Sequence, residues 1–334
     1  MTKVKSMTET LPYAEATRIL LNAESILLVT HFNPDGDAIG SLLGLGNALR
    51  ALGKRVDCAV DKELPEYLRF LPGAETVLPK LTEGSWSVMV SLDSSDEERS
   101  GDVGAYGRAH SSFVINVDHH PTNTRFGHLH LIKPQAVSTT EIVLEWVQQM
   151  QIPITREIAV PLLTGLVTDT IGFSTSNVTA YSLAQAQILM EAGASLTEIT
   201  QRTLNSMPYR TVELWKQALQ TVTLQDGVIS ALIRREVWES LGLTEPSDDG
   251  LVSWLCTANE AMVSVTFRET SDGAVNLSFR CKPGYNVASV AFALGGGGHT
   301  QASGATVKGT LDDVYARVMP MLKDAVRSGE LVIS

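Results

Sequence analysis

Four short acidic or histidine-bearing segments carry the residues best suited to chemistry. They are His31–Asp37 (HFNPDGD), Ser91–Asp93 (SLD), Asp118–Pro121 (DHHP) and Thr168–Thr170 (TDT), and each follows an apolar run. Carboxylate and imidazole groups suit manganese and related divalent ions. The segments contain no cysteine, which would have indicated structural zinc. The segments therefore predict a divided metal site, whose chemistry would be hydrolysis of a phosphate ester.

Six side chains in these segments are candidate metal ligands. The first ion would take His31, Asp35 and Asp93, and the second Asp37, Asp93, His119 and Asp169, with Asp93 bridging. Two ions about 3.5–4 Å apart can bind a hydroxide between them and both sides of a phosphoryl group. Each segment alone also has an ordinary explanation, because Asp-Gly-Asp is typical of a helix N-cap and a lone histidine is more often a core or surface residue.

Alternating strand-like and helix-like segments would bring these residues together. The apolar patterns predict strands at 25–30, 55–60, 87–92 and 112–117, with a helix at 38–52. This alternation favours a parallel sheet covered on both faces. His31, Asp93 and Asp118 each come at the carboxyl end of a strand, the edge where such sheets bind ligands.

Helices and then a smaller second unit are expected to follow. Helices are predicted from Ser138 to Met150, where Ser138 and Glu141 fit a capping box, from Pro153 toward Asp169, and at 180–192 and 196–204. Strand patterns return at 227–234, 262–269 and 274–280, and a helix at 311–326. We therefore expect an α/β chain with a parallel-sheet domain at 1–193, a helical linker at 194–214 and a mixed α/β domain at 215–334.

The four glycines Gly295–Gly298, followed by His299, are the most unusual feature of the second half. Such a run is more often a flexible hinge than a site. Glycine also permits positive φ and lets backbone N–H groups line an anion-binding nest, to which His299 can add a donor. With Arg280 on a neighbouring strand, the run is also able to hold the terminal phosphate of a nucleotide.

The net charge of the chain limits which classes of molecule it is expected to bind. The 334 residues include 26 Lys and Arg against 37 Asp and Glu, a net charge of -11. This argues against a binder of long nucleic acid, which needs many basic contacts to phosphate, but not against short oligonucleotides or small phosphorylated nucleotides. No apolar run reaches the ~20 residues that span a bilayer and the three cysteines are widely spaced, so we expect a cytoplasmic protein without a membrane partner, with homodimerisation left open.

The motifs HFNPDGDAIGS, VDHH and TDT resemble the DHH phosphoesterase family, and SFRCK followed by GGGGHTQASGA resembles its DHH-associated C-terminal domain. The resemblance implies two manganese ions on the six candidate ligands and places His120 beside the substrate phosphate, which it would steady, or whose leaving oxygen it would protonate. Asp93 and His120 are thus the expected catalytic residues. It also implies a second domain that closes over the metals and binds substrate through Arg280, Gly297, Gly298 and His299.

Within that family, a two-domain chain of this length most resembles nano-RNases and 3′-phosphoadenosine 5′-phosphate (pAp) phosphatases. The resemblance implies hydrolysis of short oligoribonucleotides to mononucleotides and removal of the 3′-phosphate of pAp. A phosphodiesterase for cyclic di-AMP or pApA is the alternative, and a non-catalytic nucleotide-binding module is disfavoured because all six ligands are present. After Thr168–Thr170 the chain has Ile171-Gly172-Phe173-Ser174 where the family often has Gly and then Phe-Arg.

Overall fold

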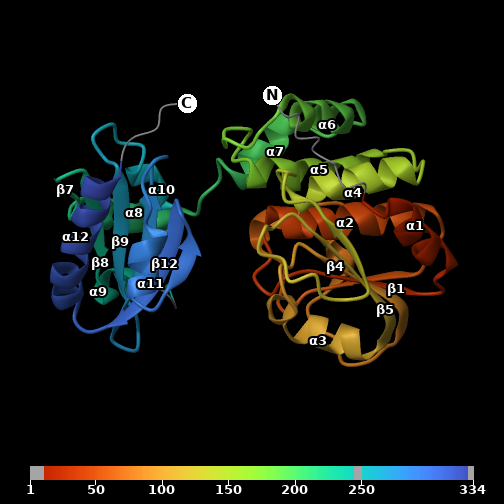
Figure 1. Cartoon of the computed structure of the whole chain (residues 1–334), viewed down its shortest axis with the longest axis horizontal. Helices are drawn as coiled ribbons and strands as arrows, with labels where there is room; N and C mark the ends of the chain where they lie inside the picture. Colours follow the sequence, from red (N-terminus) through yellow and green to blue (C-terminus); the bar gives the residue numbers. More distant parts are fainter. Residues whose placement is uncertain (1–10, 244–249, 330–334) are drawn as a thin grey trace, which may run out of the picture. The chain divides into compact units, whose positions relative to one another are not determined.

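The computed structural model describes residues 11–243 and 250–329 and contains two six-stranded sheets (Figure 1). The chain folds into two compact units, the first ending at Ser206 and the second beginning at Met207. The expected fold class, a parallel-sheet domain followed by a smaller mixed α/β domain, is confirmed. Within the described ranges, no helix is both long and apolar enough to cross a membrane.

The first unit alternates strands and helices as predicted, with further short elements between them. Its strands are β1 Ile26–Val29, β2 Val56–Ala59, β3 Val77–Leu78, β4 Trp86–Leu92, β5 Ser111–Asp118 and β6 Leu129–Ile132. Its helices are α1 Tyr13–Asn22, α2 Gly36–Ala51, α3 Gly101–Ala109, α4 Thr139–Gln149, α5 Arg156–Asp169, α6 Ala180–Glu191 and α7 Leu196–Thr203. Short 3₁₀ helices lie at Glu66–Leu68, Ala74–Thr76 and Glu98–Ser100.

All strands of the first sheet are parallel, in the order β3-β2-β1-β4-β5-β6. Helices α2, α4 and α5 lie on one face and α3 on the other (Figure 1). Leu28 and Val90 pack into the core on the first face, whereas Val29 and Met89 pack on the α3 side. Because both faces are covered, the strands are continuous apolar runs and not alternating ones.

Glycines on α2 let α5 approach its backbone closely. A Cβ at Gly40 would lie 2.5 Å from the carbonyl oxygen of Pro161, and one at Gly44 would lie 2.3 Å from Leu162 Cδ2. On α5, a Cβ at Gly165 would lie 2.8 Å from Asp37 Oδ1. Any larger residue would force the helices apart, so these glycines bring α5 directly against the carboxylate of Asp37.

The second unit is a mixed sheet with helices packed against it. Its strands are β7 Thr223–Gln225, β8 Val228–Ile233, β9 Val263–Glu269, β10 Ala274–Cys281, β11 Gly297–His299 and β12 Ala302–Lys308, in the order β11-β12-β10-β9-β8-β7. Its helices are α8 Tyr209–Leu219, α9 Arg235–Ser240, α10 Leu251–Leu255, α11 Ala288–Ala293 and α12 Leu311–Ser328. Only the β8–β9 pair among the described strands of this sheet is parallel.

The second half of the glycine run, Gly297 and Gly298, is part of this sheet and not a free hinge. Gly297–His299 form the edge strand β11, which pairs with β12. A Cβ at Gly296 would lie 2.1 Å from the carbonyl oxygen of Gly304, and Gly298 has a φ of +133°. Glycine is therefore needed here for close backbone packing and for a conformation that other residues rarely adopt.

Candidate metal centre

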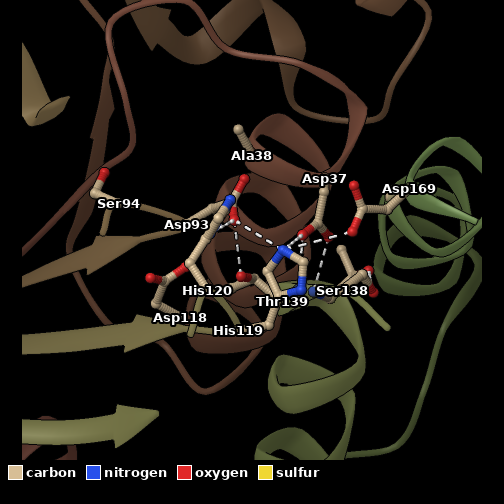
Figure 2. Close-up of polar contacts among 12 residues, drawn as sticks. Asp37, Ala38, Asp93, Ser94, Asp118, His119, His120, Ser138, Thr139 and Asp169 are labelled. Atoms are coloured by element: carbon tan, nitrogen blue, oxygen red, sulfur yellow. Dashed lines mark hydrogen bonds and ion pairs between the residues drawn. The ribbon is translucent and has the colours of Figure 1, made fainter. Parts of the chain in front are cut away.

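The candidate ligands meet at the carboxyl edge of the first sheet. His31 follows β1, Asp93 follows β4 and His119 follows β5, while Asp37 lies in the first turn of α2 and Asp169 ends α5. Figure 2 shows Asp37, Asp93, His119 and Asp169 turned toward one another. Segments up to 138 positions apart in the sequence therefore contribute to one cluster, as the ends of parallel strands allow.

The cluster contains three overlapping groups of candidate ligand atoms, and one of them joins Asp93 to His119 and His120. The ligand atoms of His31, Asp35 and Asp93 lie within 4.8 Å of one another, as do those of Asp37, His119 and Asp169. Asp93 Oδ2 is 3.5 Å from Nε2 of His31, and Asp93 Oδ1 is 3.7 Å from Nε2 of His119. The structure thus brings the six residues together, and their division between two metal ions stays a prediction.

Asp93 occupies a strained position at the centre of this cluster. Its φ is 56°, in the left-handed region, and its amide donates to the carbonyl of Val117 at 2.9 Å. Aspartate and asparagine tolerate this conformation better than most residues other than glycine. The residue is 2% exposed, so the turn directs a charged side chain into the interior.

Asp35 is both an N-cap and a member of the first group. Its Oδ1 accepts hydrogen bonds from the amides of Asp37 (3.0 Å) and Ala38 (3.1 Å). The predicted start of the helix, Ala38, was late by two residues, because α2 begins at Gly36. A Cβ at Gly36 would lie 2.3 Å from Thr168 Oγ1, so glycine allows this turn to pack against α5.

Burial and like charge perturb the carboxylates. Burial, reinforced by the charge of Asp93, raises the pKa of Asp37 well above its usual range and that of Asp169 to about 8. Burial also tends to raise the pKa of Asp93. The hydrogen bond with His31 and the nearby imidazoles outweigh this effect and lower the pKa of Asp93 to about 2. Buried carboxylates this close together repel one another, and divalent cations relieve that repulsion. The residues present therefore fit divalent ions.

The two histidines of the Asp-His-His run are in different states. Burial lowers the pKa of His119, which favours the neutral imidazole that binds metals. A hydrogen bond between His120 Nδ1 and Asp118 Oδ1 (2.8 Å) raises the pKa of His120 to about 9, so this ring is protonated near neutral pH. Asn123 donates to the other oxygen of Asp118 (2.7 Å), a contact that no sequence pattern indicated.

The N-terminus of α4 points at Asp37, which sequence analysis did not predict. The amides of Thr139 and Thr140 donate to Asp37 Oδ2 (2.6 Å) and Oδ1 (2.9 Å).

The predicted capping box of α4 is only half present. Ser138 Oγ accepts from the amide of Glu141, but the Glu141 carboxylate bonds Lys133 and Ser182 instead of returning to the backbone of Ser138.

The segment after Asp169, where the chain departs from the family pattern, is also strained. Ile171, Gly172 and Phe173 have φ values of 49°, 67° and 65°. A positive φ is unusual for any residue other than glycine and rarest for a β-branched one such as Ile171. Ile171 is 63% exposed, whereas Phe173 packs on the core.

Two of the predicted substrate-binding residues, Arg280 and His299, lie on one face of the second sheet. Arg280 and His299 both pair with Ala302 in the strand register, one from β10 and one from β11, so the two side chains share a face. The face also carries an open pocket of about 450 Å³, lined by Arg268, Asn276, Ser278, Gly295, Gly296 and Gly304 among others. Arg268 was missed, because nothing in its local sequence distinguishes it from other strand residues.

Comparisons with known proteins agree with this architecture. Residues 25–166 match the DHH family, N-terminal domain, and residues 242–327 match the DHHA1 domain. The bifunctional oligoribonuclease and PAP phosphatase NrnA of Thermus thermophilus is 40% identical over 92% of each chain.

Two solved structures share the fold. An exopolyphosphatase-related protein from Bacteroides fragilis has a TM-score of 0.86 at 24% identity, covering 94% of this chain and 97% of its own. RecJ in complex with Mn²⁺ from Thermus thermophilus has a TM-score of 0.52 at 12% identity, covering 94% of this chain and 54% of its own. At these identities the likeness concerns the fold alone.

The raised pKa of Asp169 predicts how the metal-free fold responds to pH. The pKa of this carboxyl is about 8 in the folded chain, against 3.8 ordinarily. Its contribution to stability is therefore fully present below pH 3.8, where it is protonated in both states, and is lost as the pH rises through 8. With a chelator present, the Asp169→Asn variant should therefore gain stability relative to wild type as the pH rises. Tm measured from pH 4 to 9 tests this, with exposed Glu83→Gln as control; a constant difference in Tm would contradict it.

Proposed function

The chain belongs to the DHH family, and we propose that it is a manganese-dependent phosphoesterase that hydrolyses short oligoribonucleotides to mononucleotides and removes the 3′-phosphate of pAp. The observation that carries this proposal is the position of the Asp93 carboxylate. Its Oδ2 faces His31 of one group of ligands, and its Oδ1 faces His119 of the other. The 40% identity to an enzyme named for these two activities supports the choice of substrates.

Two divalent ions held on either side of Asp93 would supply a nucleophile at neutral pH and neutralise charge on the phosphoryl oxygens. We assign the first to His31, Asp35 and Asp93, and the second to Asp37, Asp93, His119 and Asp169. The mixture of carboxylate and imidazole suits Mn²⁺. The Mn²⁺ complex of RecJ, which shares the fold, is consistent with that metal.

His120 is the proposed proton donor and phosphate contact. Its side chain is 24% exposed and its Nδ1 is held by the buried carboxylate of Asp118. In the metal-free chain the hydrogen bond to Asp118 raises the pKa of His120 to about 9, which favours the protonated ring that a general acid needs. His120 is therefore able to steady the phosphate or to protonate the leaving oxygen.

The second unit would bind the distal phosphate of the substrate. Arg280 supplies a fixed positive charge on the face it shares with His299. Gly297 and Gly298 belong to the edge strand, whose outer N–H groups face no other strand among residues 11–243 and 250–329. Guanidinium, imidazole and backbone N–H donors together are suited to a terminal phosphate.

Asp93→Asn tests the bridge. The amide preserves the size of the side chain and its tolerance of positive φ, but it has one oxygen and no charge. We expect turnover to fall by more than about 100-fold and Mn²⁺ binding to fall below two ions per chain. Loss of a residue that only hydrogen-bonds a metal ligand costs up to about 100-fold, so loss of a ligand itself should cost more. Asp61→Asn, at a residue that caps α3, is the matched control. Near-normal turnover with two bound ions would remove the bridging assignment.

Arg280→Ala and His299→Ala test the second unit. Each should raise KM for pAp by roughly 10-fold or more, the cost of a hydrogen bond to a charged group, while Mn²⁺ stoichiometry stays unchanged. Arg317→Ala, at an exposed residue of α12, is the control for charge alone. Loss of bound manganese in either variant would refute this division of labour.

Substrate length tests the reaction class. A chain of net charge -11 repels a long polyanion, so hydrolysis should be fastest on pAp and on two to about five nucleotides and slow on a 24-mer. Initial rates with Mn²⁺ on pAp, a dinucleotide, a 5-mer, a 24-mer and cyclic di-AMP make the comparison. Equal rates on dinucleotide and 24-mer would contradict short-substrate selectivity, and preference for cyclic di-AMP would replace the proposed substrate.

A further inference from the structure

Thr139, the first residue of α4, contacts carboxylates from both of the proposed groups of metal ligands. Its amide donates to Asp37 Oδ2 (2.6 Å) and its hydroxyl donates to Asp93 Oδ1 (3.0 Å) (Figure 2). We propose that Thr139 is a positioning residue that orients the bridging carboxylate and thereby sets the affinity of the second metal ion. The inference rests on the proposed function, because it takes Asp93 as the bridging ligand.

The hydroxyl of Thr139 is not needed for the helix itself. The N-cap of α4 is Ser138, whose Oγ accepts from the amide of Glu141. The Thr139 hydroxyl instead points out of the helix to a residue 46 positions away in the sequence. A capping role therefore does not account for it.

The contact lies in an environment where it is strong. Thr139 is fully buried, and Asp93 is 2% exposed, so water does not compete for the bond. Hydrogen bonds to an ionised carboxylate are stronger than neutral ones, and low polarity strengthens them further. The branched side chain of threonine has few rotamers, and the hydrogen bond from its amide to the Asp37 carboxylate fixes its backbone, so the donor is pre-positioned.

The geometry makes the effect specific to the second ion. Each carboxylate oxygen has two lone-pair directions, and Thr139 uses one of them on Asp93 Oδ1. The same oxygen lies 3.7 Å from Nε2 of His119, a ligand proposed for the second ion, and 3.6 Å from Nδ1 of His120. Asp93 Oδ2, which faces His31 in the first group, is not the oxygen that Thr139 contacts. Loss of the hydroxyl should therefore weaken the second ion more than the first.

Three variants at this position separate the hydroxyl from the shape of the side chain. Thr139→Val keeps the shape without the donor, Thr139→Ala removes the donor without a branched replacement, and Thr139→Ser keeps the donor. The matched control is Thr164→Val, since Thr164 is equally buried but donates to Val160 within its own helix. Mn²⁺ is titrated into each metal-free protein with free Mn²⁺ followed by EPR, and Tm in chelator is recorded.

We expect Thr139→Val and Thr139→Ala to bind one ion as wild type does and the other about 10–100-fold more weakly, the usual effect of losing an outer partner of a ligand. Thr139→Ser and Thr164→Val should bind both ions as wild type does. Unchanged binding in Thr139→Val and Thr139→Ala, or equal weakening in Thr139→Ser or Thr164→Val, would overturn the inference alone. A wild-type protein with fewer than two Mn²⁺ sites would overturn the proposed function as well.

Discussion

Repulsion among buried carboxylates is the interaction on which the first unit depends. Burial, reinforced by the charges of Asp93 and of the exposed Asp35, raises the pKa of Asp37 and Asp169 in the folded chain. Such a cluster is unfavourable unless protons or cations neutralise it. The proposed ions would relieve this repulsion, so the repulsion would strengthen their binding. The size of the repulsion would appear in how the stability of the metal-free fold depends on pH.

The surrounding structure holds the carboxylates together against this repulsion. The N-terminus of α4 gives two amide donors to Asp37, and the positive end of a helix stabilises a negative charge there. Gly165 admits α5 to the same carboxylate, and Asp93 is held in a left-handed turn by its bond to Val117. Three helices and the ends of three strands thus converge on one small volume.

The second unit carries positive charge on one face of its sheet. Arg268 and Arg280 lie on its exposed sheet face beside an edge strand made of glycine and histidine. In the proposed function, metal ions would act at the reacting phosphorus and these donors on another phosphate of the substrate. The acidic balance of the whole chain then disfavours long polyanions, which is consistent with a small substrate.

The sequence by itself determined the four central strands of the first sheet, three strands of the second, half of the described helices and the convergence of His31, Asp93 and His119. It could do so because apolar periodicity is local and parallel strands end at one edge. It did not reveal the donation from Thr139 to Asp37, which joins residues 102 positions apart, nor the edge strand formed by the glycine run. These features depend on which surfaces pack together. Only the tertiary structure decided them, since a hydrogen bond between distant segments leaves no periodic signal in either segment.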